Sequence, residues 1–398
     1  MWPAPVLMMV ALVLCLVGGV LYLAGCSSGS LVNTSLGKAT VPSATSQPDP
    51  TSAASSPLSS APSTSAPSPT STSLATSAPP LTVSASGDVM GDRGVGQFIA
   101  QHGGPALFTQ VKTLFQVSDI GFVNLETPVS TRGTRNTQKS VTFRSPPALV
   151  QGLSAGHINV VSLANNHALD YGAVALADTF HYLDTAHIAH AGAGANLSAA
   201  RAPAILDTPA GKVAVLAFTD IIPAGFSATA TRAGLSPTRP DQTAMLNAIR
   251  SAAREAKYVI VSFHWGIEYT DQANAEQRSL AHAAIDAGAD LVLGAHPHVL
   301  QGLELYRGKL IAYSLGDFVF DHYSQATGET VVLQVKLSPA GKPSVTCVPV
   351  YLNAATGVPA PVTGKEANNI LTRLTAISAP LGVHLVRSGS TAVFNGGA

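Results

Sequence analysis

The sequence predicts a layered α/β domain in which two sheets are flanked by helices. From residue 81 onward, short apolar runs rich in Val and Ile alternate with amphipathic stretches, which is typical of buried strands connected by helices. Five of these runs are followed directly by polar or ionisable residues. Ligand sites in open α/β sheets form outside the carboxyl ends of strands, so the same pattern predicts a functional site at one sheet edge.

The elements follow one another along the chain in an alternating order. Short apolar runs predict buried strands at 81–85, 120–125, 158–164, 213–218, 258–263 and 290–293. Amphipathic stretches between them predict helices at 105–116, 148–156, 173–185, 241–256 and 275–287. Two later strands, 310–314 and 330–337, have no clear helix between them, which favours a second, partly antiparallel sheet. We place the domain at 81–340 and treat the weakly patterned residues 341–398 as its C-terminal extension.

The first 25 residues predict an export signal. Residues 6–24 are almost entirely apolar, which is short for a membrane span and suits the apolar region of a signal peptide. The following Leu23-Ala24-Gly25-Cys26 resembles the lipobox of bacterial lipoproteins, which implies that residues 1–25 are removed and Cys26 is lipidated. No Lys or Arg precedes the apolar run, so an uncleaved anchor helix is the alternative. Both interpretations place the rest of the chain in the cell envelope, on the extracellular face of the cytoplasmic membrane.

Residues 26–80 are predicted to form a disordered stalk. Between residues 39 and 80, all but five residues are Ala, Ser, Thr or Pro, and such a segment has too little apolar surface to offset the entropy of ordering. A coil of roughly 55 residues spans about 40 Å. The stalk would therefore hold the folded domain away from the membrane.

Charge and cysteine content exclude a nucleic-acid-binding protein and a domain stabilised by disulfide bonds. The chain has 22 basic and 22 acidic residues and no long basic run, so it lacks the electrostatic surface of a nucleic-acid-binding protein. Cys15 and Cys26 belong to the N-terminal segment, which leaves Cys347 alone in the domain. A lone cysteine forms no intramolecular disulfide, so the stability of the domain has to come from its hydrophobic core.

The polar residues at the strand ends are Asp, Glu, Asn and His. In chain order they are Asp88, Asn124, Glu126, Asn166, His167, Asp170, His264, His296 and His298. Each alone has an ordinary interpretation, such as a helix cap or a packed core histidine. We expect Pro297 to hold His296 in an extended conformation, so that His296 and His298 face the same way. Two imidazoles with carboxylates nearby suit a divalent transition metal, and the set as a whole predicts a metal site.

The order of these motifs resembles the CapA-type capsule-synthesis family, which is linked to poly-γ-glutamate capsules and belongs to the calcineurin-like metallophosphoesterase superfamily. The shared motifs, between residues 83 and 320, are Gly-Asp, Asn-Leu-Glu, Asn-Asn-His-x-x-Asp-x-Gly, His-Trp-Gly, Gly-Ala-His-Pro-His and Ser-Leu-Gly-Asp-Phe. The resemblance implies a calcineurin-like sandwich of two sheets flanked by helices. It implies that His167 is the catalytic histidine and that Asp170 orients it. The metal positions it implies are Asp88, Glu126, Asn166, His264, His296 and His298.

The chain departs from the superfamily pattern at three positions. The usual Asp-x-His is Asp88-Val89-Met90 here, and methionine does not replace imidazole for a hard or borderline divalent ion. Glu126 stands where an aspartate normally bridges two metals, and Asp317 stands where the family more often has asparagine. We therefore expect one or two ions of Mn, Fe or Zn, with Asp92 or His322 as candidates to complete a second position.

The leading expectation is a metal-dependent hydrolase that acts on a phosphoester or an anionic polymer. Arg93, Arg144 and Asn124 are candidates for substrate binding, because guanidinium groups pair with phosphate or carboxylate; ordinary surface arginines are the alternative. A second interpretation is a non-catalytic accessory subunit that associates with the membrane subunits of a capsule synthase or exporter. A third is an amide or γ-glutamyl hydrolase or transferase.

Overall fold

The structure is a computed structural model that describes residues 79–338 and 341–396. The predicted signal peptide, the lipidation site at Cys26 and nearly all of the predicted stalk lie outside these residues. None of the helices in the described ranges has the length and apolarity that crossing a membrane requires.

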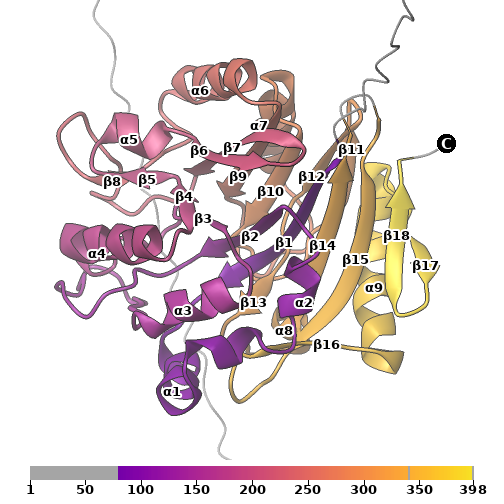
Figure 1. Cartoon of the computed structure of the whole chain (residues 1–398), viewed down its shortest axis with the longest axis horizontal. Helices are drawn as coiled ribbons and strands as arrows, with labels where there is room; N and C mark the ends of the chain where they lie inside the picture. Colours follow the sequence, from indigo (N-terminus) through magenta and orange to yellow (C-terminus); the bar gives the residue numbers. More distant parts are fainter. Residues whose placement is uncertain (1–78, 339–340, 397–398) are drawn as a thin grey trace, which may run out of the picture. The chain divides into compact units, whose positions relative to one another are not determined.

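Two mixed β-sheets form the body of the described part (Figure 1). The first has the strand order β17-β18-β15-β14-β1-β2-β3-β4, with β13 also paired to β1 and β16 to β15. Strands β1 to β4 run parallel, whereas β14 is antiparallel to β1. The bounds are β1 (Leu81–Val89), β2 (Ile120–Leu125), β3 (Val160–Ser162), β4 (Ala189–Ala191), β13 (Asp317–Val319), β14 (Glu329–Leu337), β15 (Ser344–Leu352), β16 (Pro359–Pro361), β17 (Val386–Ser388) and β18 (Thr391–Asn395).

The second sheet has the order β11-β12-β10-β9-β7-β6. Its four inner strands are parallel, and its two edge strands pair antiparallel with their neighbours. The bounds are β6 (Ala204–Thr208), β7 (Gly211–Thr219), β9 (Tyr258–His264), β10 (Leu291–Ala295), β11 (Leu303–Tyr306) and β12 (Lys309–Ala312). A separate short pair consists of β5 (Ala193–Gly194) and β8 (Gly234–Leu235).

The helices lie mainly on the outer faces of the two sheets (Figure 1). Met245 of α6 and Leu280 of α7 pack on the second sheet, and Leu149 of α3 and Leu176 of α4 pack on the first. The bounds are α1 (Arg93–His102), α2 (Lys112–Phe115), α3 (Ala148–Ala155), α4 (Gly172–Thr185), α5 (Leu197–Arg201), α6 (Gln242–Glu255), α7 (Ala275–Asp286), α8 (Gln325–Gly328), α9 (Gly364–Ser378) and the 3₁₀ helices η1 (Gly104–Phe108) and η2 (Ala379–Leu381).

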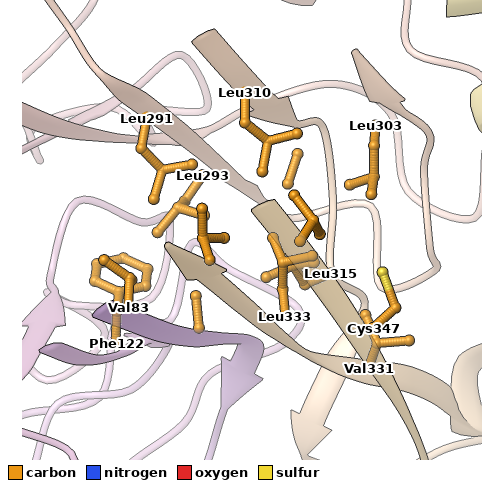
Figure 2. Packing of buried hydrophobic residues seen from close by; sticks show 14 of the residues in the cluster. Val83, Phe122, Leu291, Leu293, Leu303, Leu310, Leu315, Val331, Leu333 and Cys347 are labelled. Atoms are coloured by element: carbon orange, nitrogen blue, oxygen red, sulfur yellow. The ribbon is translucent and has the colours of Figure 1, made fainter. Parts of the chain in front are cut away.

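The main hydrophobic core lies between the sheets. Val83 and Phe122 of the first sheet share one cluster of buried residues with Leu291 of the second (Figure 2). Successive residues of β7 face opposite ways: Val215 belongs to this core, whereas Leu216 belongs to the cluster formed with α6 and α7. A sheet buried on both faces requires near-continuous apolar strands, which is the pattern seen in the sequence. The predicted fold class, two sheets flanked by helices, is confirmed.

Some elements differ from the prediction. The helix expected at 105–116 is divided into η1 and α2, although residues 106–115 contain no Gly or Pro. The first of these helices packs closely on α3, because an added Cβ on Gly104 would stand 1.7 Å from the carbonyl oxygen of Ala148. The two late strands join different sheets, β12 next to β10 and β14 next to β1. Residues after 341 extend the first sheet through β15 and add α9, for which the sequence shows little pattern.

Candidate metal centre

The predicted metal residues meet where the carboxyl ends of strands from both sheets approach one another. Asp88 lies at the end of β1, and Asp88 is the register partner of Asn124 on β2 and of Asp317 on β13. His264 ends β9, and the remaining residues lie on the turns that follow β2, β3 and β10. The side chains of Asp88, Glu126, His264, His296 and His298 are all buried. The expected gathering at one rim is therefore what the structure shows.

Glycines in the motifs permit this convergence. An added Cβ on Gly87 would lie 1.7 Å from the carbonyl oxygen of Gly316, so only glycine lets β1 approach the segment that carries Asp317. At Gly294 an added Cβ would lie 2.0 Å from the carbonyl oxygen of Tyr313. The indole of Trp265 occupies the neighbouring space and donates to the same Tyr313 oxygen at 2.9 Å, which fixes the start of the loop after His264.

One candidate ion position lies among Glu126, His264 and His296. Each of these residues offers a ligand atom, and the three atoms lie within 4.8 Å of one another. Glu126 Oε1 is 3.7 Å from His264 Nε2. Asn166 reaches the same imidazole, with its Oδ1 atom 3.0 Å from His264 Nε2. This position therefore combines carboxylate, imidazole and amide groups.

A second candidate position shares Glu126 and adds Asp88 and His298, again with ligand atoms within 4.8 Å. Asp88 Oδ2 lies 3.7 Å from His298 Nδ1. The same His298 Nδ1 atom lies 2.8 Å from Asp317 Oδ1, so Asp317 orients this imidazole. Glu126 belongs to both groups. Although its side chain is longer than that of an aspartate, it is therefore in a position to bridge two ions.

The chemistry of this cluster fits a divalent cation. Glu126 Oε1 and His296 Nδ1 are buried without a hydrogen-bond partner among the described residues, and such groups are costly unless something compensates them. Burial raises the pKa of Glu126 well above its usual value, and Asp88 adds to that rise. Burial also lowers the pKa of His264 well below its usual value. A cation between these groups would favour the ionised carboxylate and the neutral imidazole, which are the forms that bind metal.

At the opposite corner of the cluster, His298 contacts Asp317. Burial raises the pKa of Asp317 to about 7 despite the opposing influence of His298. For His298, burial favours the neutral imidazole, but Asp317 and the neighbouring carboxylates Glu126 and Asp88 outweigh it and raise the pKa well above its usual value. Without a bound ion, Asp317 is therefore the largest influence that favours the protonated form of His298.

The predicted extended conformation of the His-Pro-His segment is wrong. The φ angles of His296 and His298 are +98° and +57°, so both residues lie in the left-handed region and the segment bends after β10. Contacts from outside the segment hold the bend: Asp88 Oδ2 accepts from the His296 backbone N–H at 3.2 Å, and Pro297 O accepts from Tyr269 N–H at 2.8 Å. Strained backbone of this kind is costly and persists where surrounding structure enforces it.

Asn124 orients carboxylates and does not face the cavity. Its side-chain N–H group donates to Asp88 Oδ1 at 2.9 Å and to Glu126 Oε2 at 3.3 Å. Its Oδ1 atom accepts from Asn165 at 3.3 Å. Only 1% of Asn124 is exposed, so the structure places it behind the carboxylates, while its role as a substrate-binding residue stays a prediction. The two residues of the Asn-Asn pair thus have different roles: Asn165 supports Asn124, and Asn166 approaches His264.

His167 stands beside the cluster with its two nitrogens in different surroundings. Nδ1 lies 2.6 Å from Asp170 Oδ2, and Nε2 lies 4.0 Å from Glu126 Oε1. Lys139 Nζ lies 2.5 Å from the other oxygen of Asp170, and the ring of Phe143 covers the imidazole at a centroid distance of 4.2 Å. Burial lowers the pKa of His167 although Asp170 opposes this shift.

A cavity of about 470 Å³ opens onto the cluster, and His167, His298 and Asp317 form part of its wall. Arg93 lines the cavity and donates to Asp321 at 3.3 Å and to Tyr323 at 2.9 Å.

Three other residues considered from the sequence are engaged elsewhere. Arg144 is not among the cavity-lining residues; its guanidinium lies over the ring of Tyr171 at 4.3 Å. Asp92 caps α1, and His322 Nδ1 contacts the backbone oxygen of Ser324 at 3.2 Å. Neither Asp92 nor His322 belongs to an ion-binding group among the described residues.

The sequence analysis overlooked Lys139 and Glu268. Lys139 lies in the loop between β2 and α3, where no strand end or motif marks it. Glu268 is four residues after His264. It therefore lies beyond the strand end, and the search for polar residues at strand ends did not identify it.

Comparisons with known proteins identify the family of this chain. The family model described as bacterial capsule synthesis protein PGA_cap matches residues 82–322. The chain is 34% identical to the PGA biosynthesis protein CapA of Bacillus subtilis (strain 168), over 74% of this chain and 78% of that protein. It is also 34% identical to the capsule biosynthesis protein CapA of Bacillus anthracis, over 74% and 73% of the two chains. A probable polyglutamine synthesis accessory protein of Mycobacterium tuberculosis (strain ATCC 25618 / H37Rv) is 35% identical over 52% and 56%. The chain belongs to the bacterial capsule synthesis protein family PGA_cap.

Proposed function

We propose that this protein takes part in the synthesis or export of a capsule polymer such as poly-γ-glutamate, and that it carries metal-dependent, phosphoesterase-type hydrolase chemistry. Membership of the PGA_cap family and the names of its relatives support the first part. The second part is supported by one observation above all: Glu126 is shared by two groups of buried ligand atoms. The first group would hold an ion through Glu126, His264 and His296 with Asn166, and the second would use Asp88, Glu126 and His298.

The ion would be Mn, Fe or Zn. When bound, such an ion supplies Lewis-acid polarisation of a phosphoryl oxygen and makes water more acidic. The chain itself would supply proton transfer and substrate orientation. Asp170 accepts the Nδ1 proton of His167, which leaves Nε2 as the atom that takes a proton from the attacking water and returns it to the leaving group.

Lys139 and Arg93 would prepare the site for an anionic substrate. Lys139 lies against Asp170 and lines the cavity, so it neutralises the carboxylate that orients His167. Arg93 also lines the cavity, together with Asp321 and Tyr323. A guanidinium held in this way suits a phosphate or carboxylate oxygen.

Purified full-length protein and a His167→Ala variant test the chemistry. We expect the wild type to hydrolyse at least one phosphoester in a broad substrate screen with Mn²⁺. His167→Ala should lose about 10²- to 10⁴-fold in turnover and keep its metal content. Turnover that is unchanged in the variant, or unaffected by a chelator, would refute the proposed chemistry.

A second candidate function is a non-catalytic accessory subunit of a capsule synthase or exporter. The observation that favours it is Met90, which is buried at the position where the superfamily has a metal-binding histidine. This function predicts co-purification with integral membrane partners and no metal-dependent turnover. A turnover abolished by His167→Ala would argue against it.

We propose that the domain works outside the cytoplasmic membrane, held there by a lipid on Cys26. The support is the Leu-Ala-Gly-Cys sequence that follows an apolar run. Metabolic labelling with radioactive palmitate should mark the wild type and fail to mark Cys26→Ala. Equal labelling of both proteins would exclude this anchor.

A further inference from the structure

Glu268 lies on the loop between β9 and α7, close to the metal centre on its cavity side. Its carboxylate forms a third group of ligand atoms with His296 and His298, all within 4.8 Å of one another. Unlike the members of the other two groups, Glu268 is exposed and lines the cavity. The Glu268 carboxylate forms no hydrogen bond or ion pair within residues 79–338 and 341–396.

The backbone holds Glu268 against the His-Pro-His bend. The next residue, Tyr269, donates its N–H to Pro297 O at 2.8 Å, and its ring stacks on His298 at a centroid distance of 5.9 Å. Tyr269 has a φ of +62°, a left-handed conformation that is costly for a residue with a side chain. These contacts fix the loop that carries Glu268 to the loop that carries the two imidazoles.

The centre has room for another anionic ligand. Only 5% of His296 is exposed, and its Nδ1 atom has no hydrogen-bond partner among the residues that the structure describes. Carboxylate oxygen is a suitable ligand for Mn, Fe and Zn. A carboxylate from the cavity side would supply a missing ligand without any change in the core.

We infer that Glu268 is an additional ligand of the metal centre, which would bind through its carboxylate beside His296 and His298. The inference rests on the proposed metal centre and adds a residue outside the six superfamily positions. This ligand would lie at the wall of the cavity through which substrate would enter. The same carboxylate would thereby lie between the ion and the substrate cavity.

Co²⁺ binding to the full chain tests this inference without an activity assay. Glu268→Gln is compared with the wild type and with Glu255→Gln, a control at an exposed glutamate on α6. We expect Glu268→Gln to weaken Co²⁺ affinity by at least about tenfold in competition with a chelator and to change the d–d absorption spectrum of the bound ion. Glu255→Gln should change neither. All three metal-free proteins should have the same melting temperature.

Three results would overturn the inference. The first is an unchanged affinity and spectrum in Glu268→Gln. The second is a loss of affinity that vanishes at high salt with an unchanged spectrum, which would show that Glu268 acts through its charge alone. The third is a wild type that binds no Co²⁺, and only that result would also remove the proposed metal centre.

Discussion

Glu126→Gln should change stability in opposite directions with and without a bound divalent ion. The Glu126 carboxyl is fully buried, its Oε1 atom has no partner among the described residues, and burial together with Asp88 raises its pKa. Glutamine has nearly the same shape and no charge, so it removes a poorly compensated ion from the metal-free protein. An unsatisfied buried polar group costs about 1–3 kcal/mol. We expect the variant to gain stability of this order in a chelator at alkaline pH.

With Mn²⁺ present the order should reverse, because Glu126 belongs to two ion-binding groups. At a free Mn²⁺ concentration about 100 times Kd, binding stabilises the wild type by about 2.7 kcal/mol. For a domain of more than 300 residues this raises Tm by roughly 4 °C. The glutamine variant loses an anionic ligand at both positions, so its Tm should rise much less.

The pH dependence of the metal-free protein has a definite sign. Because the pKa of Glu126 is raised in the folded state, the folded protein keeps a proton that the unfolded chain has already released. Stability is therefore full below the usual glutamate pKa and falls as pH rises through the raised pKa. Glu126→Gln should show a shallower fall.

Thermal unfolding in chelator and in Mn²⁺, across a range of pH, measures all three effects, with Glu255→Gln as the control. The reasoning would be refuted if Glu126→Gln were less stable than the wild type in chelator. It would also be refuted if Mn²⁺ raised the Tm of the variant as much as that of the wild type.

Three further substitutions test other parts of the account. Lys139→Met removes an ammonium that disfavours protonated His167, so the imidazole pKa measured by NMR should rise; a fall would contradict the described contact. Asp170→Asn removes the group that favours protonated His167, so the same pKa should fall, and turnover should drop by about 10²-fold or more. If the pKa of His167 and the turnover were both unchanged, Asp170 would not control His167. Leu293→Ala opens a cavity between the sheets and should lower the free energy of unfolding by about 2–5 kcal/mol in a denaturant titration. A loss as small as that of a surface substitution would contradict the two-sheet core.

Much of the fold was predictable because its central strands are buried on both faces. Runs such as Val213–Phe218 are apolar throughout, and the structure places alternate residues in two different cores. The C-terminal strands and α9 were harder to predict, since β15 alternates between buried and partly exposed residues. The division of 105–116 into η1 and α2 was not predicted, because residues 106–115 contain no Gly or Pro to mark it.

The candidate site was predictable where its residues directly follow strands. Asp88, Glu126 and His264 lie at or next to strand ends, and parallel strands bring their carboxyl ends to one edge. The bend at His296 was not predictable from Pro297, because hydrogen bonds from β1 and from the Tyr269 loop decide it. Residues that reach the site from loops, as Lys139 does, carry no positional signal in one sequence.

The most direct measurement is anomalous X-ray diffraction from crystals grown with Mn²⁺. The account predicts a peak among Glu126, His264 and His296, with a second peak beside Asp88 and His298 if two ions bind. Crystals in which these side chains surround no anomalous peak at a saturating Mn²⁺ concentration would contradict the central claim that this rim of the two sheets is a metal centre.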